Sequence, residues 1–183
     1  MDDLEAIRLL KSGDLRGLEA LMERYQVKAA RAAFLITHDK AVAQDVVQET
    51  FIRIHDRIHQ FDPSYPFEPY LIRSVIHASL NAIRGDRKFT SLDDQNELEN
   101  LLDRAASIES QVEFTQLQQE VLNALSKLSP RQRAVIVQRY YLEMSEREMA
   151  LTLDAAPGTV KWLLNAARDR LRHLLGQKGE PNG

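Results

Sequence analysis

Hydrophobic residues along the chain recur at the three- and four-residue spacing of an amphipathic helix, and no stretch alternates strictly as a half-buried strand would. The first clear stripe follows the turn KSGD and predicts a helix that ends near THD; its members are Leu18, Leu21, Tyr25, Ala29 and Ala32. A second stripe, capped by Asp39, predicts a helix over residues 40–60; its members are Val47, Phe51, Ile54 and Ile58. The prolines of DPSYP end that helix, and a third is predicted from Phe67 to about Arg84. We therefore expect an all-α protein.

The C-terminal third carries two helix-start signals of the same type. A helix is predicted to end at KLS; its apolar members are Leu117, Val121, Leu122 and Leu125. Ser129 and Ser145 are each followed, three residues later, by the Gln or Glu of a capping box. The second signal predicts a short helix over about 146–152, a turn through LDAA, and a longer helix from Pro157. This is the pattern of a helix-turn-helix, whose second helix ordinarily enters the major groove of DNA.

Composition narrows the class of protein. The chain has 183 residues, of which 44% are hydrophobic, enough to fill a core. It contains no cysteine, which excludes disulfides and thiolate chemistry. No apolar run approaches the ~18 residues that span a bilayer, and the acidic N-terminus lacks a signal-peptide core. We expect a cytoplasmic protein that is not inserted in a membrane.

Charge divides the chain into three parts. Acidic and basic residues number 13 and 13 over residues 1–92, 8 and 1 over 93–120, and 6 and 10 over 121–183. An acidic connector therefore joins a neutral piece to a basic one. The predicted divisions are an N-terminal domain over 1–92, an acidic linker over 93–113, a C-terminal domain over 114–178 and a tail over 179–183.

Two groups of motifs, in this order, carry a resemblance to a known family. AQDVVQETFIRI upstream, and LSPRQRAVIVQRYYLEMSEREMALTL with PGTVKWLL downstream, resemble bacterial RNA polymerase sigma factors of the sigma-70 family, in the extracytoplasmic-function (ECF) group. The resemblance covers roughly residues 10–90 and 115–175. It implies two small helical domains, called regions 2 and 4, that bind core RNA polymerase, recognise promoter DNA and begin its melting. It implies no catalytic residue, cofactor or metal. Many ECF factors are held by an anti-sigma protein, although no residue here identifies one.

The outer side of the second helix is the predicted polymerase contact. With the core stripe turned inward, helical periodicity puts four residues on the outer face: Asp45, Gln48, Glu49 and Ile52. An isoleucine among acidic and amide side chains suits a basic, partly apolar partner. In the family, the corresponding DxxQE face binds a coiled coil of the largest subunit of the polymerase. The alternative is a solvated acidic face.

The third helix carries the predicted contact with melted DNA. A row of aromatic, amide and basic side chains lies opposite its buried side: Tyr70, Arg73, His77, Asn81 and Arg84, extended by Arg87 and Lys88. Such side chains stack on unpaired bases and hold their phosphates. Family members use this surface for the −10 element, where tryptophan is frequent at the position of Tyr70 and asparagine at that of His77. The alternative is a polar face with Tyr70 packed at a domain edge.

The last helix carries the predicted contact with duplex DNA at the −35 element. Thr159 and Lys161 would hold the backbone, Trp162 and Asn165 would face base edges, and Arg168 would add sequence-independent attraction to phosphate. The family often has PGTVKSRLHRAR, so two arginines are missing here, which implies weaker phosphate affinity. A competing interpretation has Trp162 and Leu163 binding protein instead.

Two other function classes remain open on the sequence. The first is a stand-alone helix-turn-helix regulator whose N-terminal helices dimerise or sense a ligand; it has no need of the outer face with Asp45 and Glu49. The second is a metal enzyme, suggested by HDRIH, which puts His55 and His59 one turn apart. No third ligand is obvious, and two surface histidines are the simpler interpretation.

Overall fold

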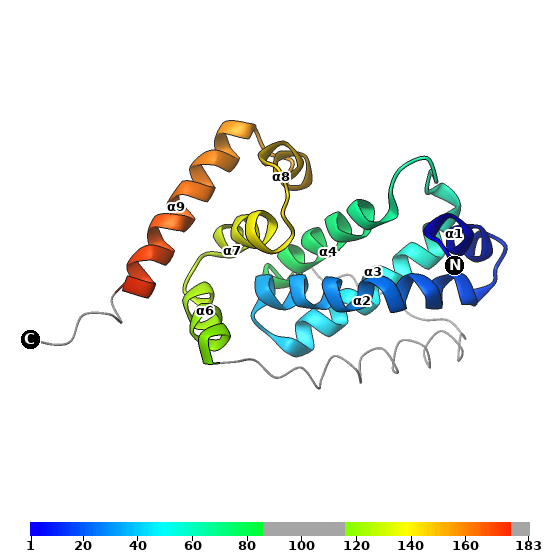
Figure 1. The fold of residues 1–183 in the computed structure, drawn as a ribbon, viewed down its shortest axis with the longest axis horizontal. Helices are drawn as coiled ribbons and strands as arrows, with labels where there is room; N and C mark the ends of the chain where they lie inside the picture. The colour runs from blue at the N-terminus through cyan, green and yellow to red at the C-terminus, as the bar shows by residue number, and fades with distance from the viewer. Residues whose placement is uncertain (86–115, 177–183) are drawn as a thin grey trace, which may run out of the picture.

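The computed structural model describes residues 1–85 and 116–176. In these two ranges the regular elements are all helical, which confirms the predicted all-α class. They form two blocks, an N-terminal block (residues 1–85) and a C-terminal block (residues 116–176), as Figure 1 shows. None of the described helices is long and apolar enough to cross a membrane. The predicted linker over 93–113 lies outside the described residues, so the domain boundaries stay predictions.

The N-terminal block consists of four α-helices and one short 3₁₀ turn. The elements are α1 (Asp3–Lys11), α2 (Leu15–Thr37), α3 (Lys40–Arg57), the turn η1 (Ile58–Gln60) and α4 (Phe67–Ile83). The second, third and fourth helices follow the predicted stripes. Helix α1 was not predicted, although Asp2 caps it through the Glu5 amide, a signal that was available in the sequence.

The core of the N-terminal block is built from the predicted stripes. Phe51 and Leu18 are fully buried in it, and Phe67 joins them from the first turn of α4. Helices α1 and α2 approach closely at Gly17, where an added Cβ would overlap the Ala6 carbonyl oxygen and the Leu10 amide nitrogen. Glycine is required there because only a residue without a side chain lets the two backbones meet.

The C-terminal block contains the predicted helix-turn-helix. Its elements are α6 (Gln116–Ser126), α7 (Pro130–Ile136), a π-helical segment η2 (Val137–Tyr141), α8 (Glu146–Leu153) and α9 (Pro157–Gly176). Both predicted capping boxes are present, with Ser129 bonded to the Gln132 amide and Ser145 to the Glu148 amide. Asp154 turns the chain between α8 and α9 in the left-handed conformation, at φ 50°. A separate apolar core, with Met149, Val160 and Leu164 at its centre, holds α7, α8 and α9 together.

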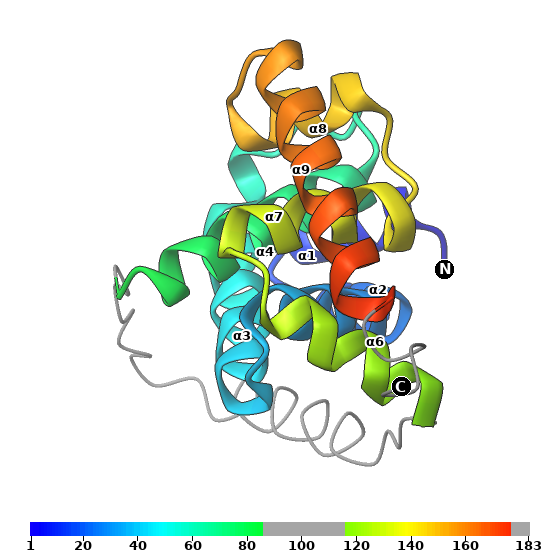
Figure 2. The ribbon, with the colours of Figure 1, turned by 90° about the vertical axis from the view of Figure 1, so that its left-hand side faces the viewer.

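The two blocks touch each other along α2 and α4 on one side and α7 and α8 on the other. Figure 2 shows α7 lying against α4, and α8 also contacts α4. The sequence predicted both blocks but not this contact. Consequently the surroundings of the α4 side chains depend on both halves of the chain.

Candidate nucleic-acid interface

The predicted residues of α4 lie on one side of that helix, and we call them the α4 row: Tyr70, Arg73, His77, Asn81 and Arg84. Arg73, Asn81 and Arg84 are exposed. Arg84 Nη2 donates a hydrogen bond of 2.6 Å to Asn81 Oδ1, so the Asn81 amide nitrogen is not used in this bond. Arg87 and Lys88 lie outside the described residues.

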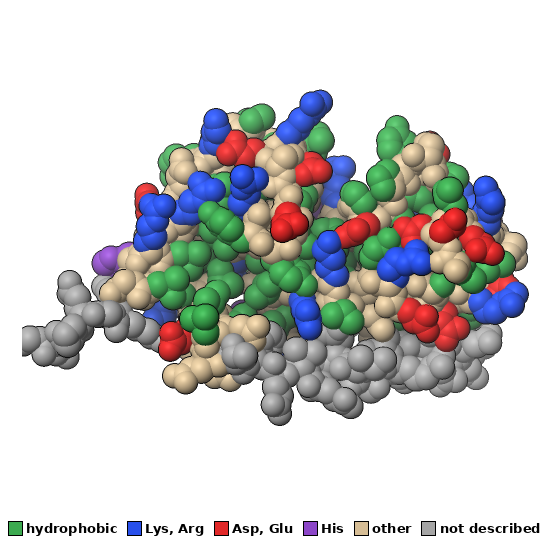
Figure 3. Space-filling model, in the orientation of Figure 1, with side chains coloured by type: hydrophobic (Ala, Val, Ile, Leu, Met, Phe, Trp, Pro, Cys, Tyr) green, Lys and Arg blue, Asp and Glu red, His purple; other side chains and the backbone are tan. Residues whose placement is uncertain are grey.

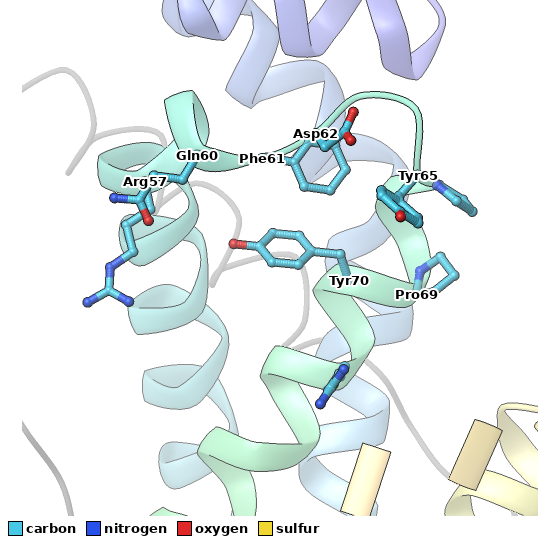
Figure 4. A pocket seen from close by; sticks show the side chains of 9 residues that line it. Arg57, Gln60, Phe61, Asp62, Tyr65, Pro69 and Tyr70 are labelled. Atoms are coloured by element: carbon cyan, nitrogen blue, oxygen red, sulfur yellow. The ribbon is translucent and has the colours of Figure 1, made fainter. Parts of the chain in front are cut away.

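Tyr70 lies at the wall of a pocket at one end of α4. Its ring centroid is 4.9 Å from that of Phe61 and 6.2 Å from that of Phe67, so the ring is half-buried in an aromatic cluster. Part of the Tyr70 side chain thus packs against the aromatic side chains of its own block. The other part of the side chain lines a pocket of about 570 Å³ together with Arg57, Gln60, Tyr65 and Arg73. We call this the α4 pocket; Figure 4 shows the Tyr70 hydroxyl directed toward Arg57 and Gln60.

Most residues of the α4 pocket were missed in the sequence, among them Arg57, Gln60 and Tyr65. These three come from the end of α3, from η1 and from the loop before α4, which periodicity does not describe. The available signal was the DPSYP loop, whose prolines hold an exposed tyrosine next to the Tyr70 helix. Asp62 at the rim accepts a 2.9 Å hydrogen bond from the Ser64 amide, and hydrogen bonding from Ser64 lowers the pKa of this carboxyl.

His77 is the member of the α4 row that the structure does not leave open. The ring is half-buried, and its Nε2 hydrogen-bonds the carbonyl oxygen of Thr152 at the end of α8. The prediction of a row open to solvent along its whole length is therefore wrong at His77. Periodicity predicts the side of the helix on which His77 lies. It does not predict that side being covered by Thr152 of α8, which lies 75 residues further along the chain.

The predicted polymerase face of α3 is only partly as expected. Asp45 is exposed, and Gln48 and Glu49 are partly exposed on the same side of the helix. Ile52 is only 7% exposed and belongs to the core of the N-terminal block, so its predicted outward position is wrong. The buried arc of α3 is wider than the four-residue stripe that defined it, because it also takes in Val46, Thr50 and Ile52. The outer face is therefore polar and acidic.

The histidines of HDRIH do not form a metal-binding cluster with other described residues. His55 Nδ1 lies 3.0 Å from Asp56 Oδ1. Among residues 1–85 and 116–176, no group of three or more His, Cys, Asp or Glu side chains is placed to hold a metal ion. The structure of these residues offers nothing that favours the metal-enzyme alternative.

The predicted residues of α9 stand on the outer side of the second helix of the helix-turn-helix, and we call them the α9 row: Thr159, Lys161, Trp162 and Asn165. All four are exposed, and Trp162 has 68% of its surface in contact with solvent. The opposite side of the helix packs into the C-terminal core through Val160, Leu163 and Leu164. Leu163 is therefore buried, so the competing interpretation loses one of its two exposed apolar residues.

Arg168 does not stand alone on α9. Its Nε donates a 2.6 Å hydrogen bond to the hydroxyl of Tyr140, and its guanidinium carbon lies 5.6 Å from the centre of the Tyr140 ring. Tyr140 comes from the π-helical segment and was not predicted as a site residue. Figure 3 shows Lys and Arg side chains over α8 and α9 with Asp and Glu side chains among them, and Lys161 Nζ of the α9 row lies 3.9 Å from Glu146 Oε2.

The two helical blocks correspond to two regions of one family. Residues 21–89 match the family model described as Sigma-70 region 2, and residues 118–171 match the model described as Sigma-70, region 4. With both regions present in this order, the chain belongs to the sigma-70 family of RNA polymerase sigma factors. Within that family it is a factor of the ECF type.

Relatives support the ECF assignment over nearly the whole chain. ECF RNA polymerase sigma factor SigW of Bacillus subtilis is 27% identical, with 92% of this chain and 94% of that protein aligned. RNA polymerase sigma factor CnrH of Cupriavidus metallidurans is 29% identical over 92% of each chain. The solved structure of CnrH in complex with the cytosolic domain of CnrY has a TM-score of 0.64 at 26% identity, covering 96% of this chain and 97% of that one. The sigma factor RpoE of Bartonella quintana, solved with the anti-sigma factor NepR, shares the fold, with a TM-score of 0.61 over 85% of this chain and 95% of that one.

The chain is thus a sigma factor, which acts in transcription initiation with core RNA polymerase and promoter DNA as its partners. Sigma factors are transcription regulators. The stand-alone regulator, the alternative left open by the sequence, is not favoured, since residues 21–89 match Sigma-70 region 2.

Proposed function

We propose that three surfaces of this sigma factor divide the work of promoter recognition. The acidic face of α3, with Asp45, Gln48 and Glu49, binds core RNA polymerase. The α4 row and the α4 pocket take up the melted strand of the −10 element. The α9 row reads the −35 element as intact duplex. The protein performs no bond-breaking chemistry of its own, needs no cofactor, and acts in the cytoplasm.

The observation that carries this proposal is the α4 pocket. A helix-turn-helix alone suits many DNA-binding proteins, but a pocket with aromatic walls and flanking arginines suits a base that has left the stack. Arg57 and Arg73 at the pocket supply positive charge for the phosphates on either side of such a base. Because binding an extruded base offsets part of the unstacking free energy, recognition and melting become one event without ATP hydrolysis.

The geometry of α9 supports duplex reading. The helix begins at Pro157, so its first amides are free of intrahelical partners and carry the positive end of the helix dipole toward phosphate. Asn165 is suited to bidentate pairing with adenine, and the Trp162 ring to contact with a thymine methyl group. Arg168, held by Tyr140, has its terminal nitrogens available for a phosphate.

The α3 face supports polymerase binding by charge rather than by an apolar anchor, because Ile52 is buried. Acidic side chains of this kind steer a basic partner and set its orientation. The domain divisions follow the same scheme, with residues 1–92 serving core and −10 binding, the acidic stretch 93–113 as connector and residues 114–178 serving −35 binding. We also propose an anti-sigma protein as a partner, since two similar sigma factors were solved in complex with CnrY and NepR.

Transcription from a promoter library, with core polymerase and this protein, tests the whole proposal. Enriched promoters should share two separated elements, and Trp162→Ala should alter preference at the upstream one alone. Tyr70→Ala should alter the downstream one. Enrichment of a single element, or of none, contradicts the division of work.

Charge reversal tests the polymerase face separately. The double variant Asp45→Lys with Glu49→Lys should not co-purify with core polymerase, because each substitution replaces an acidic side chain by a basic one that repels a basic partner. Glu23→Lys, on an exposed position of α2, is the matched control and should leave co-purification intact. Normal binding of core by the double variant rules out this face.

A further inference from the structure

Helix α1 lies against the segment that forms the α4 pocket. It contacts the turn η1, whose last residue, Gln60, lines that pocket, and Figure 1 shows it beside this end of the N-terminal block. The match to region 2 begins at residue 21, so α1 precedes the matched range. The pocket is therefore in contact with a helix that the family model does not include.

The C-terminal end of α1 is bonded to the pocket loop through Lys11. Lys11 Nζ donates a 2.8 Å hydrogen bond to the main-chain carbonyl oxygen of Phe61, which lies 50 residues further along the chain. A hydrogen bond from an ammonium group is stronger than one between two neutral groups. Hydrogen bonding from Ser64, and to a smaller extent the charge of Lys11, lower the pKa of Asp62 at the pocket rim. Lys11 thus acts on the loop both by a bond and by its charge.

Phe61 connects this bond to the side chain that would stack on a base. Its side chain is buried, and its ring centroid lies 4.9 Å from that of Tyr70 and 5.8 Å from that of Phe67. Aromatic rings at such distances pack in preferred relative orientations. The position of the Phe61 backbone therefore affects how one face of the Tyr70 ring is supported.

The N-terminal end of α1 reaches the same aromatic cluster through Tyr25. The Tyr25 hydroxyl donates a 2.6 Å hydrogen bond to Asp3 Oδ2, and the Tyr25 ring centroid lies 5.7 Å from that of Phe67. Burial, and after it the bond to Asp3, raise the pKa of Tyr25 to about 12, so the hydroxyl stays a donor at neutral pH. Both ends of α1 are thus joined to aromatic residues that pack near Tyr70.

Between these two ends, α1 is firmly attached to α2. Ala6, Ile7 and Leu10 are buried in the core of the N-terminal block, and Gly17 lets the backbone of α2 approach that of α1 closely. Interiors packed in this way deform little. Helix α1 is therefore a rigid support for the hydrogen bond that Lys11 makes with the loop.

We propose that Lys11 is a positioning residue for strand capture. It holds the carbonyl group of Phe61, and with it the Phe61 ring and the start of the loop that carries Tyr65, so that the α4 pocket is formed before a base enters. This inference rests on the −10 role proposed above for the pocket. A pre-formed pocket binds more tightly because less conformational freedom is lost on binding. Loss of the Lys11 bond should therefore reduce strand opening and leave duplex binding by α9 unchanged.

Open promoter complexes formed with core polymerase test this role. Permanganate reactivity of unpaired thymines, on a promoter selected from the library, measures the open fraction. Lys11→Met should lower the equilibrium constant for opening roughly 5- to 10-fold, the range expected for one net hydrogen bond. Lys11→Arg keeps a charged donor and should restore most of the loss. Arg8→Met, which removes a basic side chain at an exposed position of the same helix, is the matched control and should behave as the parent does.

Two further measurements separate positioning from other roles of Lys11. Ile7→Val trims the buried side of α1 but leaves the Lys11 bond, so it should open DNA as the parent does at temperatures where circular dichroism shows both to be folded. Lys11→Met should leave the slope of log K against log salt unchanged, whereas loss of a direct phosphate contact would reduce it by about 1. If Lys11→Met does not fold, Lys11→Gln, which is uncharged and one bond shorter, takes its place.

Strand opening by Lys11→Met at the level of the parent overturns the inference. A reduced salt slope, or an equal loss of opening in Ile7→Val, overturns it as well. Tyr70→Ala separates this failure from failure of the proposed function. If Tyr70→Ala loses strand opening and Lys11→Met does not, the pocket keeps its role and only that of Lys11 is wrong. If Tyr70→Ala also opens DNA normally, the −10 assignment itself is wrong, and the positioning role falls with it.

Discussion

The two proposed DNA surfaces of this sigma factor differ in how far the fold leaves them open. The α9 row is exposed along its length, and its Lys161 Nζ approaches Glu146 Oε2 of α8, within the same block, at 3.9 Å. The α4 row is flanked on one side by the aromatic α4 pocket and on the other by α8, which takes up His77. Duplex reading therefore needs only one block to be folded, whereas strand capture depends on how the two blocks lie.

A substitution at Gly17 should destabilise the N-terminal block without affecting the C-terminal block. Gly17→Ala puts a methyl group against backbone atoms of α1, and overpacking of this kind costs about 1–3 kcal/mol, more where backbone must shift. We expect a loss of about 3 kcal/mol in the free energy of unfolding of the N-terminal block, measured by denaturant titration. The C-terminal block should keep its stability and its duplex binding.

Gly158→Ala is the matched control, because an added Cβ there meets nothing within 4 Å. Equal destabilisation of both blocks by Gly17→Ala contradicts their independence.

Substitutions of Tyr70 test the functional side of the comparison. Tyr70→Ala removes a ring whose stacking on one base contributes about 1–3 kcal/mol, which corresponds to a loss of roughly 5- to 150-fold in open promoter complexes. The measurement is permanganate reactivity of unpaired thymines with core polymerase present. Tyr70→Phe, which keeps the ring, should stay within a few-fold of the parent. Duplex binding at the −35 element should not change in either variant, and a parallel loss there removes the distinction between the surfaces.

Removal of the Arg168 charge should have a smaller effect on duplex binding by α9, and that effect should be purely electrostatic. Arg168→Ala should weaken duplex binding about equally on all sequences and reduce the slope of log K against log salt by about 1, because one phosphate contact is lost. Titrations at four or more salt concentrations measure this slope. Tyr140→Phe removes the 2.6 Å hydrogen bond that orients Arg168 and should lower affinity with the slope retained. An unchanged slope in Arg168→Ala removes this residue from the phosphate contacts.

The smallest effect concerns the turn between η2 and α8, within the C-terminal block. Glu143 has φ 53°, in the left-handed region, where a residue with a Cβ is disfavoured by roughly 1–2 kcal/mol. Since glycine has a larger chain entropy to lose, Glu143→Gly should raise the free energy of unfolding of the C-terminal block by about 0.5–1 kcal/mol. Thermal unfolding measures it. Asp154→Gly, at φ 50°, should gain less because aspartate tolerates this conformation better; a larger gain at Asp154 contradicts the strain argument.

Local signals predicted most of the fold correctly, for identifiable reasons. Asp39, Ser129 and Ser145 cap helices where the sequence indicated, because a cap is decided by side chains within three residues of it. Helix α1 was missed although Asp2 carried the same signal. The direction of Trp162 was also correct, since its helix has a strong apolar side that turns the ring outward.

The sequence predicted the candidate sites less well wherever residues from distant segments meet. Ile52 was placed outside because four residues defined the buried side of α3, while packing against the remaining helices widens that side. Arg57, Gln60 and Tyr65 were missed because a pocket gathers residues from a helix end and a loop, and no single period contains them.

The sequence by itself determined the helices, their caps, the two blocks and the family, because each depends on neighbours within a few residues or on motifs read in order. Only the tertiary structure decided that Arg133 reaches across to Ile36, that Tyr140 holds Arg168, and that His77 meets Thr152. These contacts join residues 97, 28 and 75 positions apart. Their existence depends on the packing of whole helices, which short-range periodicity does not encode.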